Sequence, residues 1–412
     1  MDDRASRASR VGRTCCTILR FVKYFKFNKK RVEMMSKADE VPAECDGLCY
    51  FIMKADFFNI QYLLQSKQRL ALKNKVSLHV AFCLIPKFLD ATIRQYHFML
   101  KGLEEVENEC QKLGIEFHLL HGEAKDVLPK IIEEHHIGGL VTDFSPLRLP
   151  QEMLKDVKET IPKNIPMCKV DAHNIVPCWL ASDKQEYSAK TIRRKIQDKL
   201  PDFLTKFPPV AKHSHESKYK AKLVDWTAAE KSLEVDRTVK PVEWATPGTH
   251  AGLDTLNQFC LKRLRKYATQ RNNPNAKSLS NLSPWLHFGQ ISAQRCVLEV
   301  KRYRKQFKDA ADDFIEEAVV RCELSDNYCF YQKNYDCVEG AYNWAITTLN
   351  DHNDWLIFGI SLLTLASFIT STSPMHGLVV TFLSGRVMLY LFFLLDFFGN
   401  RFIFFRIQYY PA

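Results

Sequence analysis

The sequence of 412 residues lacks the short motifs that define several large enzyme classes. It has no Walker A motif and no G-x-S-x-G motif, which argues against a P-loop enzyme and an α/β-hydrolase. No G-x-G-x-x-G motif follows its first predicted strands, and Gly138–Gly139 is interpreted as a helix stop rather than a phosphate loop. A nicotinamide- or nucleotide-dependent enzyme is therefore disfavoured.

The 13 cysteines show no regular spacing. Cys45 and Cys49, with Cys15–Cys16 upstream, come nearest to a metal signal, but no second C-x-x-C or H-x-x-x-H completes a tetrahedral site. We therefore interpret the cysteines as reduced intracellular thiols and expect no metal. His135 and His136 are expected to form a solvated pair at an exposed helix end.

A long apolar run is also missing before Lys37, so the N-terminus is a poor secretory signal. What the chain has is ordinary globular composition, with 46% hydrophobic and 25% charged residues, and a net charge of +11. That charge favours a polyanionic partner, either nucleic acid or an acidic membrane. The basic stretch FKFNKKR, residues 25–31, fits a nuclear-import or nucleic-acid arm, and fits a solvated basic tail equally well.

Strand and helix patterns alternate after a basic, flexible leader at residues 1–45. Apolar, β-favouring runs predict strands, and runs with helical periodicity predict helices between them. The predicted strands are 76–85, 115–122, 139–145 and one within 166–177, and the predicted helices are 92–114, 123–138 and 151–161. This order predicts an α/β domain over residues 46–177, with a doubly wound parallel sheet.

Residues 178–235 are Lys-rich and are predicted to be a linker on the surface. Helical patterns then follow at 247–270, 291–307 and 311–332. The expected organisation is α/β plus all-α, with a partial helical domain over residues 236–352 and a tail over residues 353–412.

The segment LSNLSPWLHFGQIS, residues 279–292, has the pattern of a helix start. Ser283 suits the N-cap and Pro284 suits the first helical position. The free N–H groups at such a helix start can hold a phosphate, although a capped helix that binds nothing is the other interpretation of the local pattern.

Longer stretches resemble a known family. The stretch RNNPNAKSLSNLSPWLHFGQISAQR resembles the flavin-binding segment of the photolyase/cryptochrome superfamily, and the specific similarity is to class II cyclobutane pyrimidine dimer photolyases. The resemblance runs in order from about residue 69 to residue 352. Its other motifs are GGLVTDFSPLRLP, VDAHNIVPCW, VDRTVKPVEWATPGT, EEAVVRCELSDNYCFYQKNYD and GAYNWAITTLNDH.

The resemblance implies that FAD binds in the helical domain. Hydroxyls, an amide and helix-start N–H groups suit a diphosphate. The residues implied to hold FAD are Tyr267, Ser280, Asn281, Leu282 and Ser283, with Gln290 and Arg321 in the same pocket. Arg321 is equally well explained as an ion-pair partner of Glu317, one turn back. Relatives also carry a second, light-harvesting antenna chromophore in the α/β domain, and this sequence does not identify one.

The resemblance also implies contacts with DNA. Arg271 resembles a position that contacts the DNA backbone, and Lys262 and Arg265 add to a basic face, for which a plain solvated face is the other interpretation. Glu317 resembles the carboxylate that faces a flipped pyrimidine dimer, and the competing interpretation is a surface acid beside Glu316.

The implied activity is that of a deoxyribodipyrimidine photo-lyase, a carbon–carbon lyase. Under blue or near-UV light, reduced FAD donates an electron to a dimer flipped out of damaged DNA, and the cyclobutane ring opens. The alternatives are a cryptochrome-like photoreceptor without repair activity and an inactive splice or gene-model product. We further expect a monomer with no obligate protein partner, located in the nucleus, with the cytoplasm or mitochondria as alternative further locations.

Two segments depart from the family pattern. Residues 50–65, YFIMKADFFNIQYLLQ, keep a strand-like start but lack the family's polar residues, so the first βα turn differs. Residues 353–412 carry none of the family motifs and are rich in apolar residues. We interpret this tail as non-homologous read-through rather than as a membrane anchor, since Arg386 and Asp396 interrupt its longer apolar run.

Overall fold

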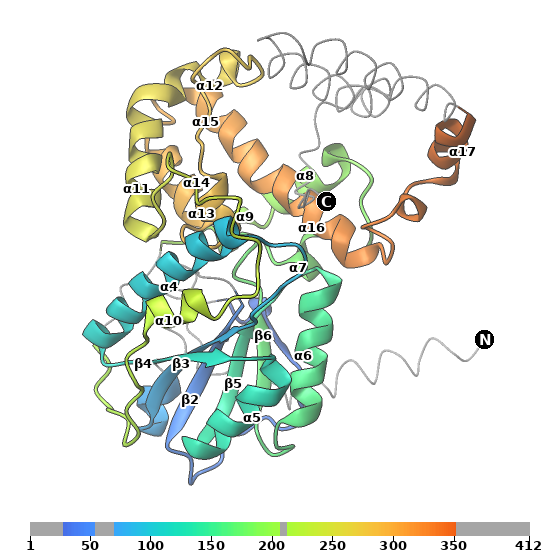
Figure 1. Cartoon of the computed structure of the whole chain (residues 1–412). Helices are drawn as coiled ribbons and strands as arrows, with labels where there is room; N and C mark the ends of the chain where they lie inside the picture. Colours follow the sequence, from blue (N-terminus) through green and yellow to red (C-terminus); the bar gives the residue numbers. More distant parts are fainter. Residues whose placement is uncertain (1–27, 54–69, 207–211, 352–412) are drawn as a thin grey trace, which may run out of the picture.

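The first part of the molecule is a six-stranded sheet in the order β1-β6-β5-β2-β3-β4. The computed structural model describes residues 28–53, 70–206 and 212–351 (Figure 1). Among the described strands, β2 to β6 pair in parallel, and only the edge strand β1 is antiparallel to its neighbour β6. The strands are β1 (Val32–Met34), β2 (Gly47–Ile52), β3 (Ser77–Leu84), β4 (Glu116–His121), β5 (Ile137–Asp143) and β6 (Met167–Val170).

Helices cover both faces of this sheet (Figure 1). On one face Leu78 and Val80 of β3 pack in one core with α4 (Ile93–Leu113). On the other face Ala81 packs with α5 (Ala124–Glu134) and α6 (Arg148–Thr160). Side chains alternate between faces along a strand, so β3, buried throughout, serves both cores. The predicted doubly wound α/β arrangement is confirmed.

Helix α4 begins and ends where its sequence predicts. The Thr92 side chain and the Gln95 side chain form a capping box at its start, and Gly114 ends it with a left-handed φ of 69°. The helix is thus fixed at both ends by local chemistry.

The prediction that Gly138–Gly139 is a helix stop is wrong, because both glycines lie inside β5. The reason at Gly138 is a close approach between chain segments. A Cβ at this position would lie 2.4 Å from the Cβ of Cys45, so only glycine lets the segment before β2 pack on β5.

The predicted leader ends earlier than residue 45. Residues Val32–Met34 form the edge strand β1, preceded by the short helix η1 (Lys29–Arg31). Arg31 is not part of a solvated basic arm: it is 2% exposed, and its guanidinium donates hydrogen bonds to the carbonyls of Asp171 and Asn174 at 2.9 and 2.8 Å. A buried arginine needs such acceptors, which the loop after β6 supplies.

The predicted linker is also more structured than its composition indicates. Its first half forms α7 (Cys178–Ala181), α8 (Ala189–Gln197) and α9 (Leu200–Phe203), and Ile192 and Ile196 share a core with Val319 and Val320 of the helical part. Its second half returns to the sheet domain, where α10 (Trp226–Lys231) packs on α4 and the Trp226 indole N–H donates to Glu107 at 2.7 Å.

The helical part follows, as predicted. Two of its long helices contain a π-helical segment, η2 and η3, where the hydrogen-bond pattern widens. Its elements are α11 (Thr249–Gln258), η2 (Phe259–Arg263), α12 (Leu264–Gln270), α13 (Ser283–His287), α14 (Ala293–Arg302), α15 (Lys308–Ile315), η3 (Glu316–Arg321), α16 (Cys322–Tyr331), η4 (Val338–Gly340) and α17 (Asn343–Asp351).

Some predictions concern residues outside the described ranges. These are the first part of the leader, the altered βα turn after β2, and the apolar tail at residues 353–412. Among the described helices, none has the length and hydropathy needed to cross a membrane.

Candidate functional site

Tyr267, Arg271 and Glu317 come together where α12 lies against α15 and η3. Tyr267 is buried, and its ring contacts those of Phe259 and Phe314. Burial, and then the charge of Glu317, raise the pKa of Tyr267 to about 12, so the phenol stays protonated. The Arg271 guanidinium lies 5.6 Å from the centre of the Tyr267 ring, in a cation–π contact.

Glu317 is a half-buried acid. Burial raises the pKa of its carboxyl, and the charges of Arg321 and Arg271 oppose that rise. The carboxylate makes no hydrogen bond to any described residue. These properties disagree with the interpretation of Glu317 as a surface acid, because an exposed carboxylate would not be desolvated.

The two π segments position these groups. Tyr267 follows η2 by one turn, and Glu317 is the second residue of η3. A π segment shifts the side chains after it relative to an ideal α-helix, and such segments are frequent at functional sites.

Arg321 pairs with Glu316 rather than with Glu317. Its Nε atom lies 3.5 Å from Glu316 Oε1, and Arg193 of α8 donates to the same carboxylate at 2.6 Å. Two arginines therefore share Glu316, and this arrangement ties α8 to η3. The charge of Arg321 still lowers the pKa of Glu317 and so opposes the effect of burial.

The segment 278–283 carries polar groups that the fold does not use. Ser278 is fully buried, and its Oγ atom has no hydrogen-bond partner among the described residues. Ser280 is half-buried and Asn281 is exposed with a left-handed φ of 58°, whereas Leu282 is fully buried and anchors the segment in the core. Arg263 is adjacent, with a guanidinium nitrogen 3.4 Å from the Ser280 carbonyl.

Ser283 is not the N-cap that the sequence predicts. It is the first residue of α13, the cap position belongs to Leu282, and no side chain caps the helix. The reason is the left-handed turn at Asn281, which brings the chain into the helix one residue earlier. The Ser283 hydroxyl is therefore exposed and not used in capping.

These groups fit the diphosphate part of FAD. A buried hydroxyl without a partner costs about 1–3 kcal/mol unless a ligand or water completes it, and Ser278 is in this position. The hydroxyls of Ser280 and Ser283 and the amide of Asn281 add donors to the same short segment, and Arg263 adds a nearby cation.

Gln290 has a different place from the one predicted. It is 1% exposed, its Oε1 atom accepts from the Gly248 N–H at 2.7 Å, and its Nε2 atom donates to the Phe98 carbonyl of α4 at 2.8 Å. Gln290 thus joins the helical part to the sheet domain through both ends of its amide. Both ends of the Gln290 amide are therefore used in connecting the two parts, rather than being directed toward a cofactor.

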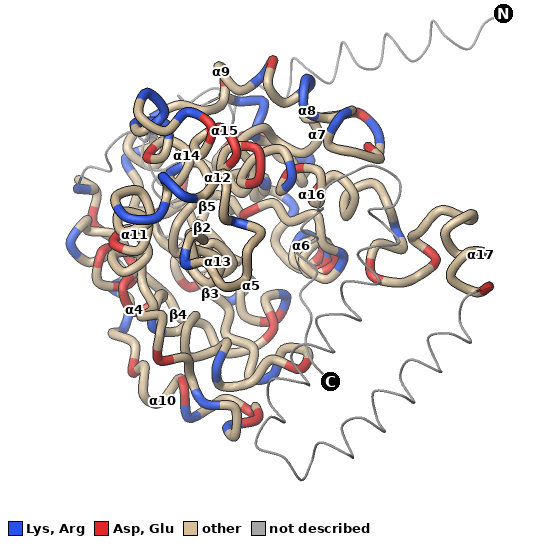
Figure 2. Tube along the Cα trace, turned by 90° about the horizontal axis from the view of Figure 1, so that it is seen from above, with Lys and Arg blue, Asp and Glu red and all other residues tan. Residues whose placement is uncertain are grey.

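The basic face holds part of the predicted DNA contacts. Lys262 and Arg265 are exposed on η2 and α12, and Figure 2 shows basic positions along the backbone trace in this part of the molecule. Arg271 is less available, because it forms an ion pair with Asp313 and stacks on Tyr267. A phosphate contact by Arg271 would have to compete with that carboxylate.

The motif VDAHNIVPCW forms a polar junction between the two parts. Asp171 is fully buried and accepts from the Asn174 and Cys178 N–H groups at 2.9 and 2.8 Å. Glu323 of α16 accepts from the Ile175 and Val176 N–H groups, each at 2.9 Å. Sequence reasoning did not find the role of Glu323, because its partners are far away in the chain.

The fold is similar to those of two solved structures. A Synechocystis sp. PCC6803 cryptochrome has a TM-score of 0.54 at 16% identity, covering 72% of this chain and 63% of that one. A class III photolyase from Agrobacterium tumefaciens has a TM-score of 0.55 at 16% identity, covering 72% and 61%. At this identity the likeness concerns the fold alone.

Sequence comparison identifies the family within that fold. The DNA photolyase family model matches residues 65–212. The deoxyribodipyrimidine photo-lyase of Potorous tridactylus is 53% identical over 346 residues, which is 84% of this chain and 64% of the relative. That of Arabidopsis thaliana is 41% identical over 332 residues, which is 78% and 67%.

The chain therefore belongs to the DNA photolyase family, and the resemblance to the class II enzymes is confirmed at the level of the family. It spans between 62% and 67% of the length of the curated relatives that it matches.

Proposed function

We propose that this protein repairs cyclobutane pyrimidine dimers in DNA in a light-dependent reaction that uses FAD. The proposal is supported by the 53% identity to a protein named deoxyribodipyrimidine photo-lyase. The observation that carries it is Glu317, a half-buried carboxyl with a raised pKa and no hydrogen bond within the described part of the chain. Glu317 lies beside a buried tyrosine and an arginine, and this setting suits a carboxyl that binds a polar ligand.

The segment 278–283 would hold the cofactor's diphosphate. Ser278 offers a buried hydroxyl, and Ser280, Asn281 and Ser283 offer polar side chains beside the cation Arg263. When bound, reduced FAD would supply the electron that opens the cyclobutane ring under blue or near-UV light.

Glu317 would recognise the flipped dimer. A carboxyl with a raised pKa is protonated more readily than a free one, so it can donate a hydrogen bond as well as accept one. The edges of a pyrimidine dimer offer both carbonyl oxygens and N–H groups. Glu317 would therefore hold the lesion after it leaves the duplex, where damaged bases are easier to unstack.

Lys262 and Arg265 would bind the DNA backbone. Both are exposed, and the net charge of the whole chain is +11. Contacts to phosphates carry no sequence information, which suits an enzyme that must find a lesion in any sequence.

The test is repair by the purified 412-residue chain of an oligonucleotide with one thymine dimer. The chain is supplied with FAD and a reductant and is compared under blue light and in the dark. The proposal predicts restored thymines only in the light, and loss of this reaction in Glu317→Ala. Flavin-loaded protein that leaves the dimer intact in the light would favour the photoreceptor alternative instead.

We also propose that the protein acts in the nucleus as a monomer. The location is supported by the proposed substrate, damaged DNA. A fluorescent fusion tests the location, and light scattering during gel filtration tests the mass. Exclusion from the nucleus or a stable dimer would contradict these two points.

A further inference from the structure

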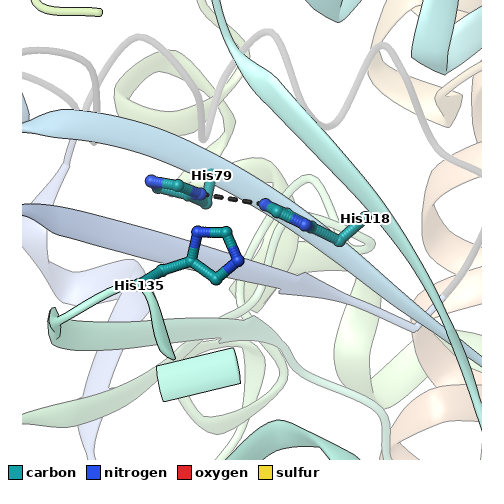
Figure 3. Close-up of side chains that lie close together, drawn as sticks. All are labelled: His79, His118 and His135. Atoms are coloured by element: carbon teal, nitrogen blue, oxygen red, sulfur yellow. Dashed lines mark hydrogen bonds between the residues drawn. The ribbon is translucent and has the colours of Figure 1, made fainter. Parts of the chain in front are cut away.

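Three histidines from distant parts of the chain meet on the sheet domain, away from the proposed flavin site (Figure 3). His79 lies on β3, His118 lies on β4, and His135 ends α5. His79 and His118 share the sheet face that α5 covers, since His118 pairs with Ala81 of that face. The cluster lies toward the amino ends of the strands, whereas Arg148, which pairs with Asp336 of the helical part, follows the carboxyl end of β5.

Hydrogen bonds fix the tautomer of His79. The Ser77 hydroxyl donates its only proton to the Asp46 carbonyl at 2.8 Å. The same oxygen lies 2.8 Å from His79 Nε2, so it must accept a hydrogen bond there and Nε2 carries the proton. His79 Nδ1 is therefore a lone pair, and it faces His118 Nε2 at 2.9 Å.

The third imidazole has one nitrogen for which the described residues supply no partner. His135 Nδ1 is buried and makes no hydrogen bond within the described part of the chain, and Figure 3 shows the ring facing the other two. Its centre is 5.2 Å from that of His79 and 4.8 Å from that of His118. Packing of three neutral histidines does not account for the buried position of His135 Nδ1, because a polar atom that is buried and unpaired is unfavourable.

The electrostatics keep the imidazoles neutral and ready to bind a cation. Burial lowers the pKa of His118 to about 3, and burial also lowers the pKa values of His79 and His135. The carboxylates of Glu134 and Glu116 raise the pKa of His135 and so oppose the effect of burial. Negative charge therefore lies near the cluster. Neutral imidazoles have free lone pairs, and nearby carboxylates offset the charge of an ion.

We propose that His79, His118 and His135 bind one zinc ion through their imidazole nitrogens, with water as the fourth ligand. The donor set is three nitrogens without thiolate, which suits zinc and similar transition metals rather than magnesium or calcium. The half-buried His135 gives the ion and the water access from solvent.

Small movements complete the site. One ligand atom from each histidine lies within 4.8 Å of the others, whereas zinc bonds of 2.0–2.1 Å place tetrahedral nitrogens about 3.3 Å apart. His135 moves inward from a helix end, and the His79 and His118 rings separate by a few tenths of an ångström. His118 transfers its proton from Nε2 to Nδ1, while Nε2–H of His79 keeps its bond to Ser77, as the second nitrogen of a metal-bound histidine usually does.

Bound zinc would join the paired strands β3 and β4 to the turn between α5 and β5. The ion would stabilise the folded chain, since it binds the assembled site and only weakly the unfolded chain.

The test uses the full chain without a histidine tag, stripped of metal with a chelator. Calorimetric titration with zinc chloride should show one ion per chain, and cobalt(II) should give the intense visible bands of a tetrahedral site. His135→Ala should lose at least tenfold in zinc affinity. His136→Ala is the matched control, since His136 is the exposed neighbour that stacks on Tyr219, and it should bind zinc as the parent does.

His118→Gln is a second variant, with circular dichroism to confirm its fold. Zinc should raise the melting temperature of the parent and of His136→Ala, and should leave that of His135→Ala unchanged. The proposal is overturned if the parent shows no saturable zinc binding, or if His135→Ala binds zinc as tightly as the parent. Neither readout depends on flavin or on repair, so the proposed function can fail without affecting this result.

Discussion

Glu317 and Glu323 lie in the same helical run, and burial raises the pKa of both carboxyls, yet they have different surroundings. Glu323 is buried at the junction and accepts hydrogen bonds from two backbone N–H groups of the loop after β6. Glu317 is half-buried and accepts none from the described residues. A raised pKa therefore does not identify a site by itself, and the partners of the oxygens decide between a structural group and a binding group.

The largest expected effect is on stability, in Glu323→Ala. This change leaves the buried Ile175 and Val176 N–H groups without an acceptor, at about 1–3 kcal/mol each. Denaturation with urea should show a loss of about 2–6 kcal/mol in the free energy of unfolding. Glu317→Ala is the matched variant and should lose less than about 1 kcal/mol. Equal losses in the two variants would remove the distinction between the two glutamates.

The next effect is on lesion recognition, in Glu317→Ala. Loss of the hydrogen bond between this carboxyl and the lesion, which leaves a polar atom of the lesion unpaired, costs about 1–3 kcal/mol, which is roughly a fivefold to hundredfold loss of affinity. Fluorescence anisotropy should show this loss for DNA with a dimer and little change for undamaged DNA. Glu317→Gln should recover part of the affinity, because an amide also donates and accepts. An equal loss of affinity for both DNAs would instead mean that Glu317 acts through the electrostatic potential of the surface and does not recognise the lesion.

A third effect depends on pH and concerns Glu323→Gln. Because the folded pKa of Glu323 is raised, its protonated form favours folding, and this stability is lost as the pH rises above the ordinary value of 4.5 toward the folded pKa. Glutamine cannot ionise, so the variant should gain stability relative to the parent over that range, by up to about 1.4 kcal/mol per pH unit. Urea denaturation at several pH values measures the difference. A variant that is less stable at every pH would show that ionised Glu323 pairs favourably with Arg31.

The smallest effect concerns the basic face, in Lys262→Ala and Arg265→Ala. Each change removes one phosphate contact, so affinity for any DNA should fall severalfold and the salt dependence of binding should drop by about one unit of slope. Lys155→Ala is the control, since Lys155 is exposed on α6 of the sheet domain. If that variant weakens binding as much, the effect belongs to net charge rather than to this face.

Local patterns predicted the elements well. Ser77–Leu84 and Ile93–Leu113 carry their periodicity and caps within a few neighbouring residues, so their bounds follow from the sequence. The resemblance predicted which residues belong to the site, but it did not predict the contacts that these residues make. Gln290 and Arg31 show why: their hydrogen-bond partners lie far away in the chain, so composition indicates only a polar or a basic residue.

The histidine cluster was missed for the same reason. A search for short-range metal motifs finds ligands on one loop or one helix turn, whereas His79, His118 and His135 are brought together by strand pairing and a helix end. His135 was predicted to be solvated, and the structure instead buries its Nδ1 atom against the sheet.

The most direct test of the proposed function is the absorption spectrum of the purified 412-residue chain after incubation with FAD and removal of the free cofactor. The segment 278–283 and its neighbours predict a blue absorption band equal to one flavin per chain, weakened by Ser278→Val. A soluble, folded chain that retains no flavin would contradict the account, because light-driven repair requires the bound cofactor.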